Sequence, residues 1–293
     1  MGMSDIPARR VIVQGFSTYY LDVGEGPVVL LVHGNASSAR DWWPFAEALT
    51  TTNRVVALSL PGYGETSPVG DVRPGRFVSF IAAFLDELGI DHVMAVGHSY
   101  GGLLVAELAL AHPRRVTRLV MIDSAGLGRA VNPLLVVESL IPVPVAEVLI
   151  TALLLPGGAA LRALGGALQL QRPWRLPKSF WVRQLRLGHS RTFLRTSFDA
   201  VRNGVGLRGQ RFDVDARLGE IHVPALVVWG ALDQLFPVWQ GVLAARKLPR
   251  GRFGLIISAS HISFIDSPAE VMNFLGPFIR DDLVEAEDAA PAR

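Results

Sequence analysis

The sequence predicts an α/β protein with a mostly parallel, doubly wound sheet and one inserted, mainly helical cap. Short apolar runs typical of buried strands alternate with helical segments from residue 28 to residue 122. Between about 123 and 221, helical segments occur without a convincing strand, and the alternation then resumes at Ala225. We therefore predict a first core part at 1–124, a cap at 125–220, a second core part at 221–280 and a disordered, acidic tail at 281–293.

The first core part contains the clearest alternation of strands and helices. On either side of Gly15, apolar and polar residues alternate enough to indicate two strands joined by a turn. The continuous apolar run Val28 to Val32 is typical of a parallel strand buried on both faces. Ser37 or Ser38 is expected to cap the helix that follows. The predicted strands are 9–14, 17–23, 28–32, 55–60, 92–96 and 116–122, and the predicted helices are 42–49, 77–88 and 102–112.

The second core part repeats this pattern after the cap. We predict strands at 225–229 and 253–258, each followed by a helix, at 239–247 and 268–280.

The two halves of the cap differ in composition. Its first half, Val131 to Leu170, is rich in Leu, Val, Ala and Pro, whereas its second half combines aromatic residues with several arginines.

Composition excludes several classes of function. The chain has 28 basic and 26 acidic residues, and a net charge of +2 does not indicate a surface that binds nucleic acid. It has no cysteine, and its seven histidines lack metal-ligand spacing, so we expect no disulfide, metal or cofactor. The apolar region 134–170 is broken by prolines and charges, which argues against a transmembrane helix. No secretory signal opens the sequence, so we expect a cytoplasmic protein.

One pentapeptide, Gly97-His98-Ser99-Tyr100-Gly101, has the pattern G-x-S-x-G. A short apolar run at 92–96 precedes it, and a Leu/Ala-rich helical segment at 102–112 follows it. A serine between such a strand and helix lies on a sharp turn, and the flanking glycines allow close approach of neighbouring backbone. Ser99 is therefore the candidate nucleophile.

This strand–turn–helix resembles the nucleophile elbow of the α/β-hydrolase family, and the resemblance covers about residues 10 to 280. In that family an acid and then a histidine follow the serine, each at the carboxyl end of a strand. Asp233, in Gly230-Ala231-Leu232-Asp233, matches the acid, and His261, just after the last predicted strand, matches the base. Asp123 is the rival acid, because some members take the acid from that earlier strand end.

The resemblance also implies an oxyanion hole. His33-Gly34-Asn35 matches the family's H-G-x loop, so the backbone N–H of Asn35 is one expected donor. The N–H of Tyr100, which follows the nucleophile and begins a helix, is the other. We expect His33 only to brace the loop. The same loop is similar to that of haloalkane dehalogenases, but these enzymes and the epoxide hydrolases have an aspartate where this chain has Ser99.

A second glycine pattern, Gly204 to Gly209, fits G-x-G-x-x-G. No predicted strand leads into it and no clear helix follows it, so we interpret it as a flexible cap loop without a dinucleotide role.

The resemblance implies a cofactor-free serine hydrolase, and the apolar cap favours a carboxylic ester with an apolar acyl or alcohol group as substrate. A carbon–carbon bond hydrolase acting on dienoate diketones is the first alternative, although such enzymes usually carry residues other than His98 and Ile262 beside the serine and the histidine. A non-catalytic binding protein is the second alternative. The apolar cap could also contact a lipid surface.

Overall fold

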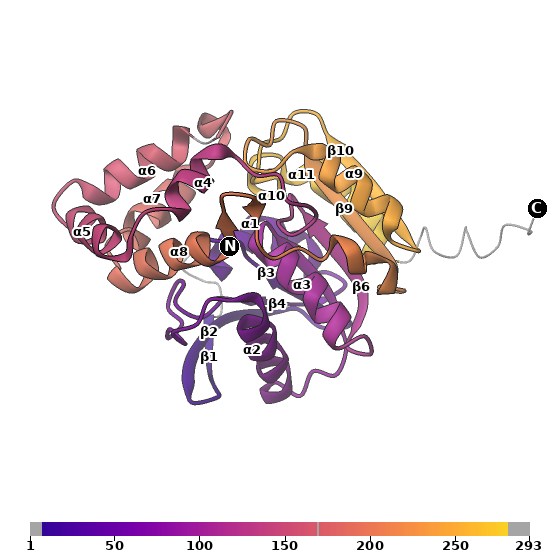
Figure 1. The fold of residues 1–293 in the computed structure, drawn as a ribbon. Helices are drawn as coiled ribbons and strands as arrows, with labels where there is room; N and C mark the ends of the chain where they lie inside the picture. The colour runs from indigo at the N-terminus through magenta and orange to yellow at the C-terminus, as the bar shows by residue number, and fades with distance from the viewer. Residues whose placement is uncertain (1–7, 169, 281–293) are drawn as a thin grey trace, which may run out of the picture.

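An eight-stranded sheet forms the centre of the computed structural model, which describes residues 8–168 and 170–280 (Figure 1). The strand order is β1-β2-β4-β3-β5-β6-β9-β10. The pairings from β4 to β10 are parallel, whereas β2 is antiparallel to both of its neighbours. The strands are β1 (Ala8–Val13), β2 (Phe16–Val23), β3 (Val28–Val32), β4 (Arg54–Leu58), β5 (Val93–His98), β6 (Val116–Ile122), β9 (Ala225–Gly230) and β10 (Gly251–Ile256).

Both faces of the sheet are covered, because alternate side chains of one strand enter two different hydrophobic clusters. Leu30 and Val32 of β3 belong to one cluster, and Val29 and Leu31 belong to the other. Helices α2 (Pro74–Glu87), α3 (Tyr100–Ala111) and α9 (Val238–Lys247) contribute to the first cluster, whereas α1 (Trp43–Ala46), α10 (Ser263–Asp266) and α11 (Pro268–Ile279) contribute to the second. The predicted mostly parallel, doubly wound fold is confirmed.

Five helices follow one another between β6 and β9, and they lie together at one end of the sheet (Figure 1). They are α4 (Pro133–Ser139), α5 (Val143–Leu153), α6 (Gly158–Leu168), α7 (Lys178–Leu187) and α8 (Arg191–Gly204), and we call residues 133–204 the cap. The boundaries proposed from the sequence, 125 and 220, stay a prediction. The predicted tail at 281–293 lies outside the described residues.

Two local predictions were wrong. The expected helix at 42–49 is divided into a 3-10 turn (Ala39–Trp42), the single turn α1 and a second 3-10 turn (Glu47–Leu49). The glycine pattern 204–209 is an ordered hairpin of β7 (Val205–Gly206) and β8 (Gly209–Gln210), not a flexible loop. The hairpin is packed closely, because a Cβ on Gly209 would overlap the carbonyl oxygen of Arg129.

Candidate active site

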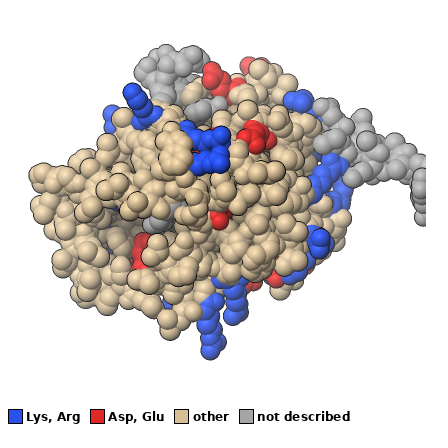
Figure 2. Space-filling model, turned by 90° about the horizontal axis from the view of Figure 1, so that it is seen from above, with Lys and Arg blue, Asp and Glu red and all other residues tan. Residues whose placement is uncertain are grey.

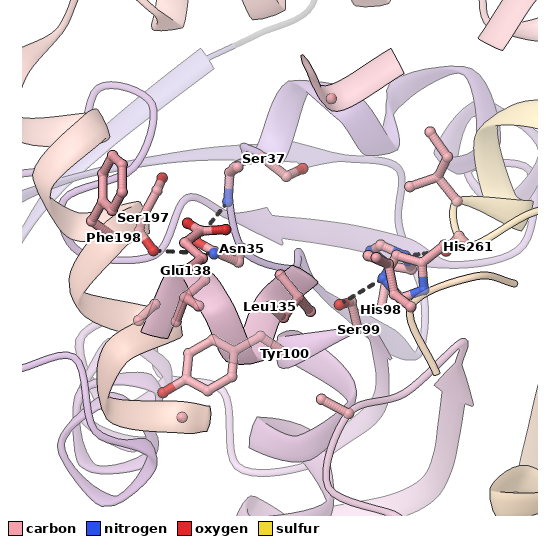
Figure 3. A pocket seen from close by; sticks show the side chains of 18 of the residues that line it. Asn35, Ser37, His98, Ser99, Tyr100, Leu135, Glu138, Ser197, Phe198 and His261 are labelled. Carbon is pink, nitrogen blue, oxygen red and sulfur yellow. Dashed lines mark hydrogen bonds between the residues drawn. The ribbon is translucent and has the colours of Figure 1, made fainter. Parts of the chain in front are cut away.

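Ser99 lies on a strained turn between β5 and α3. Its φ of 52° and ψ of −121° place it in a region that L residues rarely adopt. Gly97 and Gly101 make the turn possible, because a Cβ on Gly97 would overlap the carbonyl of Gly101, and one on Gly101 would overlap the carbonyl of Val32. The serine side chain is consequently held at the carboxyl end of β5, where it faces a cavity (Figure 3).

The structure brings the predicted nucleophile, base and acid together. The Ser99 hydroxyl lies 2.9 Å from Nε2 of His261 (Figure 3), and Nδ1 of His261 lies 2.9 Å from Oδ2 of Asp233. Because an ionised carboxylate only accepts, Nδ1 carries the proton and Nε2 is free to accept the serine proton. Oδ1 of Asp233 accepts from the backbone N–H groups of Leu235, at 2.7 Å, and Phe236, at 3.1 Å, which fix the carboxylate.

The electrostatics of His261 suit a general base. Burial disfavours the imidazolium, but the adjacent charge of Asp233 and its hydrogen bond outweigh burial and raise the pKa of His261 above the ordinary 6.5. The side chain of Asp233 is fully buried, so little solvent screens the interaction. A base of raised pKa holds an accepted proton more strongly.

Asp123, the rival acid, does not contact His261. Its Oδ1 accepts from the N–H of Gly230 at 2.7 Å, and its Oδ2 accepts from the N–H and the hydroxyl of Ser263 at 3.1 and 2.6 Å. Burial first, and then the charge of Asp233, raise the pKa of Asp123. Asp123 therefore ties the end of β6 to the end of β9 and to the start of α10, two residues after His261.

Two further side chains position His261, and the sequence patterns did not indicate either of them. Nε2–H of buried His98 donates to the backbone carbonyl of His261 at 2.8 Å. Asp266 accepts from the N–H of Ser260 at 2.8 Å and from its hydroxyl at 2.5 Å. His98 is adjacent to the nucleophile in sequence, so it links the serine turn to the histidine loop directly.

The predicted oxyanion loop lies against the nucleophile. A Cβ on Gly34 would come within 2.8 Å of the Ser99 Cβ, so only glycine fits there. Asn35 and Tyr100 both line the cavity, as the prediction requires (Figure 3). His33 stabilises the loop through both of its ring nitrogens. Its Nε2 accepts from the N–H of Leu60, and its Nδ1 donates to the Gly34 carbonyl. Burial lowers the pKa of His33 to about 4, so its ring is neutral.

Helices α7 and α8 of the cap hold this loop in place. Arg183 of α7 forms an ion pair with Asp41 at 2.7 Å, with 8% and 0% of the two side chains exposed. The neighbouring Gln184 donates to the carbonyl of Ala36 at 3.2 Å. From α8, the carbonyl of Ser197 accepts from the side chain of Asn35 at 3.2 Å (Figure 3). The loop that carries the expected oxyanion donor and the turn that follows it are thus held by the cap as well as by the core.

Replacing Arg183 with methionine should therefore affect stability and turnover together. Loss of one partner leaves the buried Asp41 charge uncompensated, which destabilises a protein by about 3–5 kcal/mol. Displacement of the oxyanion loop by about 1 Å can lower kcat up to about 100-fold. Urea unfolding and ester kinetics measure the two effects. Arg217→Met, which removes the ion pairs of an exposed arginine with Glu220 and Glu107, is the matched control, and equal behaviour of the two variants would contradict this role for Arg183.

Ser99 and His261 open into a cavity of about 520 Å³ between the sheet edge and the cap. Its wall is mainly apolar and aromatic, with contributions from Leu135, Leu153, Phe193 and Phe198 of the cap helices. Two charged residues also line it. Burial raises the pKa of Glu138 and lowers that of Arg162, whose guanidinium donates to the carbonyl of Gln184. Among the described residues, no group of three or more His, Asp or Glu side chains could hold a metal ion.

The serine lies on a strained turn and is hydrogen-bonded to a histidine, which in turn is hydrogen-bonded to a buried carboxylate. This arrangement, at the carboxyl ends of parallel strands, is typical of proteins that use a serine nucleophile. This chain belongs to the alpha/beta hydrolase fold family, whose model matches residues 27–268.

Several known proteins are similar to this chain. The pimeloyl-[acyl-carrier protein] methyl ester esterase of Aeromonas hydrophila is 27% identical over 87% of this chain and 96% of its own length. The 2-hydroxy-6-oxo-2,4-heptadienoate hydrolase of Pseudomonas putida is 36% identical, over 41% and 45%. A solved esterase of Thermogutta terrifontis has a TM-score of 0.76 at 21% identity, covering 94% and 98%. The chain spans only 33% and 65% of two other curated relatives.

Proposed function

We propose that this protein is a serine hydrolase that cleaves carboxylic esters with an apolar acyl or alcohol group through an acyl-enzyme intermediate. The observation that carries the proposal is the chain of two 2.9 Å hydrogen bonds from Ser99 through His261 to Asp233 at the base of an apolar cavity. The similarity to the Aeromonas methyl ester esterase over most of both chains supports it.

Each residue has one role in this mechanism. His261 accepts the Ser99 proton as Oγ attacks the ester carbonyl, and Asp233 stabilises the imidazolium that forms. The N–H groups of Asn35 and Tyr100 donate to the developing oxyanion. His261 then donates its proton to the leaving alcohol. In the second half, His261 deprotonates a water molecule that attacks the acyl group, and Ser99 recovers its proton as the acid leaves.

The apolar wall predicts how activity depends on the substrate. Each methylene that the cavity buries contributes about 0.8 kcal/mol, or about fourfold in kcat/KM, until the cavity is full. We expect kcat/KM to rise from acetate to medium-chain p-nitrophenyl esters. A flat or falling series measured with the purified protein would contradict binding of an apolar acyl chain in this cavity.

Carbon–carbon bond hydrolysis of a dienoate diketone is the second candidate. The Pseudomonas relative supports it, and so does Arg162, whose buried Nε has no partner among the described residues and whose guanidinium could attract an anion. Glu138 in the same wall disfavours an anionic substrate. Turnover of a dienoate diketone that exceeds turnover of every ester tested would favour this candidate over the ester hydrolase. Absence of both activities, with correct folding, would favour a non-catalytic binding protein.

A further inference from the structure

The outer surface of the first three cap helices is apolar to an unusual extent. On α6, Leu161, Leu164 and Leu168 are 65%, 58% and 77% exposed, and they share one helix face. Helices α4 and α5 add residues of the same kind, and Trp174, between α6 and α7, is 77% exposed. The apolar face, as we call it, consists of Leu134, Val137, Leu140, Val143, Val145, Val148, Leu149, Leu155, Leu161, Leu164, Leu168 and Trp174.

Charged side chains are few in residues 133–168, which carry all of this apolar face except Trp174. Residues 133–168 contain three charges, and each of them is turned inward or paired. Glu138 and Arg162 line the cavity, and Glu147 pairs with Arg191 and Arg195 of α8. The left side of Figure 2, where the cap lies, is accordingly almost entirely tan, with a hollow in it. Exposed apolar residues gathered in this number on one part of a protein surface mark an interaction site.

The cap as a whole is strongly basic. Residues 133–204 contain nine basic and three acidic residues, a net charge of +6, although the whole chain carries only +2. Lys178 and Arg186 of α7 are exposed and have no acidic partner among the described residues. Outside the cap, the described residues 8–132 and 205–280 contain 18 basic and 17 acidic residues, a net charge of +1, so most of the positive charge of the described part of the chain lies in the cap.

The apolar face is also continuous with the cavity. Gly165 and Gly166 line the cavity and are exposed on the same turns of α6 that present Leu164 and Leu168. On α4, Leu135 and Glu138 line the cavity, while Leu134 and Val137 point outward. If a lipid surface covered this face, an apolar molecule could therefore pass from it into the cavity without crossing water.

We propose that the cap docks onto the surface of a lipid bilayer that contains anionic lipids. The apolar face would enter the boundary between headgroups and acyl chains, and the basic part of the cap would contact lipid phosphates. This arrangement requires no spanning helix. No single described helix is long and apolar enough to cross a membrane, and α4 and α5, which pass that test only together, are bent by 105°. The inference depends on the surface of the cap and not on the proposed ester hydrolysis.

A second copy of the chain is the competing occupant, and charge disfavours it. Two cap surfaces brought face to face would each contribute a net charge of +6, which opposes association, whereas an anionic bilayer attracts both features of the cap at once.

The choice between a bilayer and a second copy can be tested by vesicle co-sedimentation with the full chain at 20 and 200 mM salt. The vesicles consist of phosphatidylcholine alone, or of phosphatidylcholine with about 30 mol% phosphatidylglycerol.

We expect the protein to sediment with the anionic vesicles and to bind the neutral ones far more weakly. Leu161→Asp with Leu164→Asp should abolish binding to both. Lys178→Glu with Arg186→Glu should weaken binding to the anionic vesicles by at least about 30-fold, the loss expected from removing two basic residues, and should reduce the salt dependence. The matched controls are Ile12→Asp, at a 59% exposed apolar residue on β1, and Arg114→Glu, at an exposed arginine outside the cap. Thermal melting shows that each variant is folded.

Two results would overturn the proposal. One is the absence of vesicle binding by the folded protein at low salt. The other is a dimer in size-exclusion chromatography with light scattering that Leu161→Asp with Leu164→Asp dissociates, since this would assign the face to a second copy. Because sedimentation does not depend on turnover, a protein that binds vesicles but cleaves no ester would refute only the proposed function.

Discussion

Ser99→Ala is expected to lower kcat for ester hydrolysis by about 10⁴- to 10⁶-fold, because the nucleophile, base and acid act as one unit. The residual activity would come from the oxyanion donors and from binding in the cavity. The fold should be unchanged, since alanine removes only the hydroxyl, whose one hydrogen-bond partner among the described residues is Nε2 of His261. Stopped assays with a medium-chain p-nitrophenyl ester measure the loss.

A fluorophosphonate probe gives an independent measurement of the same prediction. It should label the wild-type protein at Ser99 and should not label Ser99→Ala. Ser124→Ala is a suitable control, because Ser124 is also buried beside α3 but its hydroxyl donates to the carbonyl of Ala125. Labelling that persists in Ser99→Ala, or that disappears in Ser124→Ala, would show that the nucleophile has been assigned to the wrong serine.

Asp233→Asn is expected to have the second largest effect, a loss of up to about 10⁴-fold in kcat. Asparagine can donate a hydrogen bond to Nδ1 of His261, which favours the tautomer that carries its proton on Nε2. In that tautomer His261 cannot accept the Ser99 proton. Asp123→Asn should lower kcat far less, because Asp123 contacts Gly230 and Ser263 and not the imidazole. The reverse order of effects would make Asp123 the acid.

The pH profile tests the same residue through its charge. His261 must be neutral to act as a base, so kcat/KM falls as the pH drops through its pKa. Since Asp233 raises that pKa, the wild-type midpoint should lie above 6.5. In Asp233→Asn the burial effect remains and the charge is gone, so the midpoint of the residual activity should move to lower pH. A midpoint that stays in place would mean that Asp233 does not act on His261 electrostatically.

Local patterns in the sequence predicted the fold and the three side chains that the structure brings together. Strands buried on both faces require continuous apolar runs such as Val28 to Val32, and these runs are visible without a structure. Ser99, Asp233 and His261 each follow such a run. Because the carboxyl ends of parallel strands meet at one edge of a sheet, their order along the chain was sufficient to predict that they converge.

Only the tertiary structure decided which of two acids contacts the base. Asp123 and Asp233 both follow a strand, and β6 and β9 are neighbours in the sheet, so sequence position left both possible. The choice depends on side-chain direction: the loop after β9 places Asp233 beside Nδ1 of His261, whereas Asp123 is held by donors from Gly230 and Ser263. No local pattern encodes such a direction.

The same limit applies to the cap. Its composition predicted an apolar lid, but composition does not distinguish residues that pack inward from residues that face solvent. Arg183 and Leu161 illustrate both outcomes, because the arginine is buried against Asp41, 142 positions earlier in the chain, and the leucine is 65% exposed. Contacts between residues so far apart in sequence arise only when the cap folds onto the sheet. For this reason the bracing of the oxyanion loop and the apolar face emerge from the tertiary structure alone.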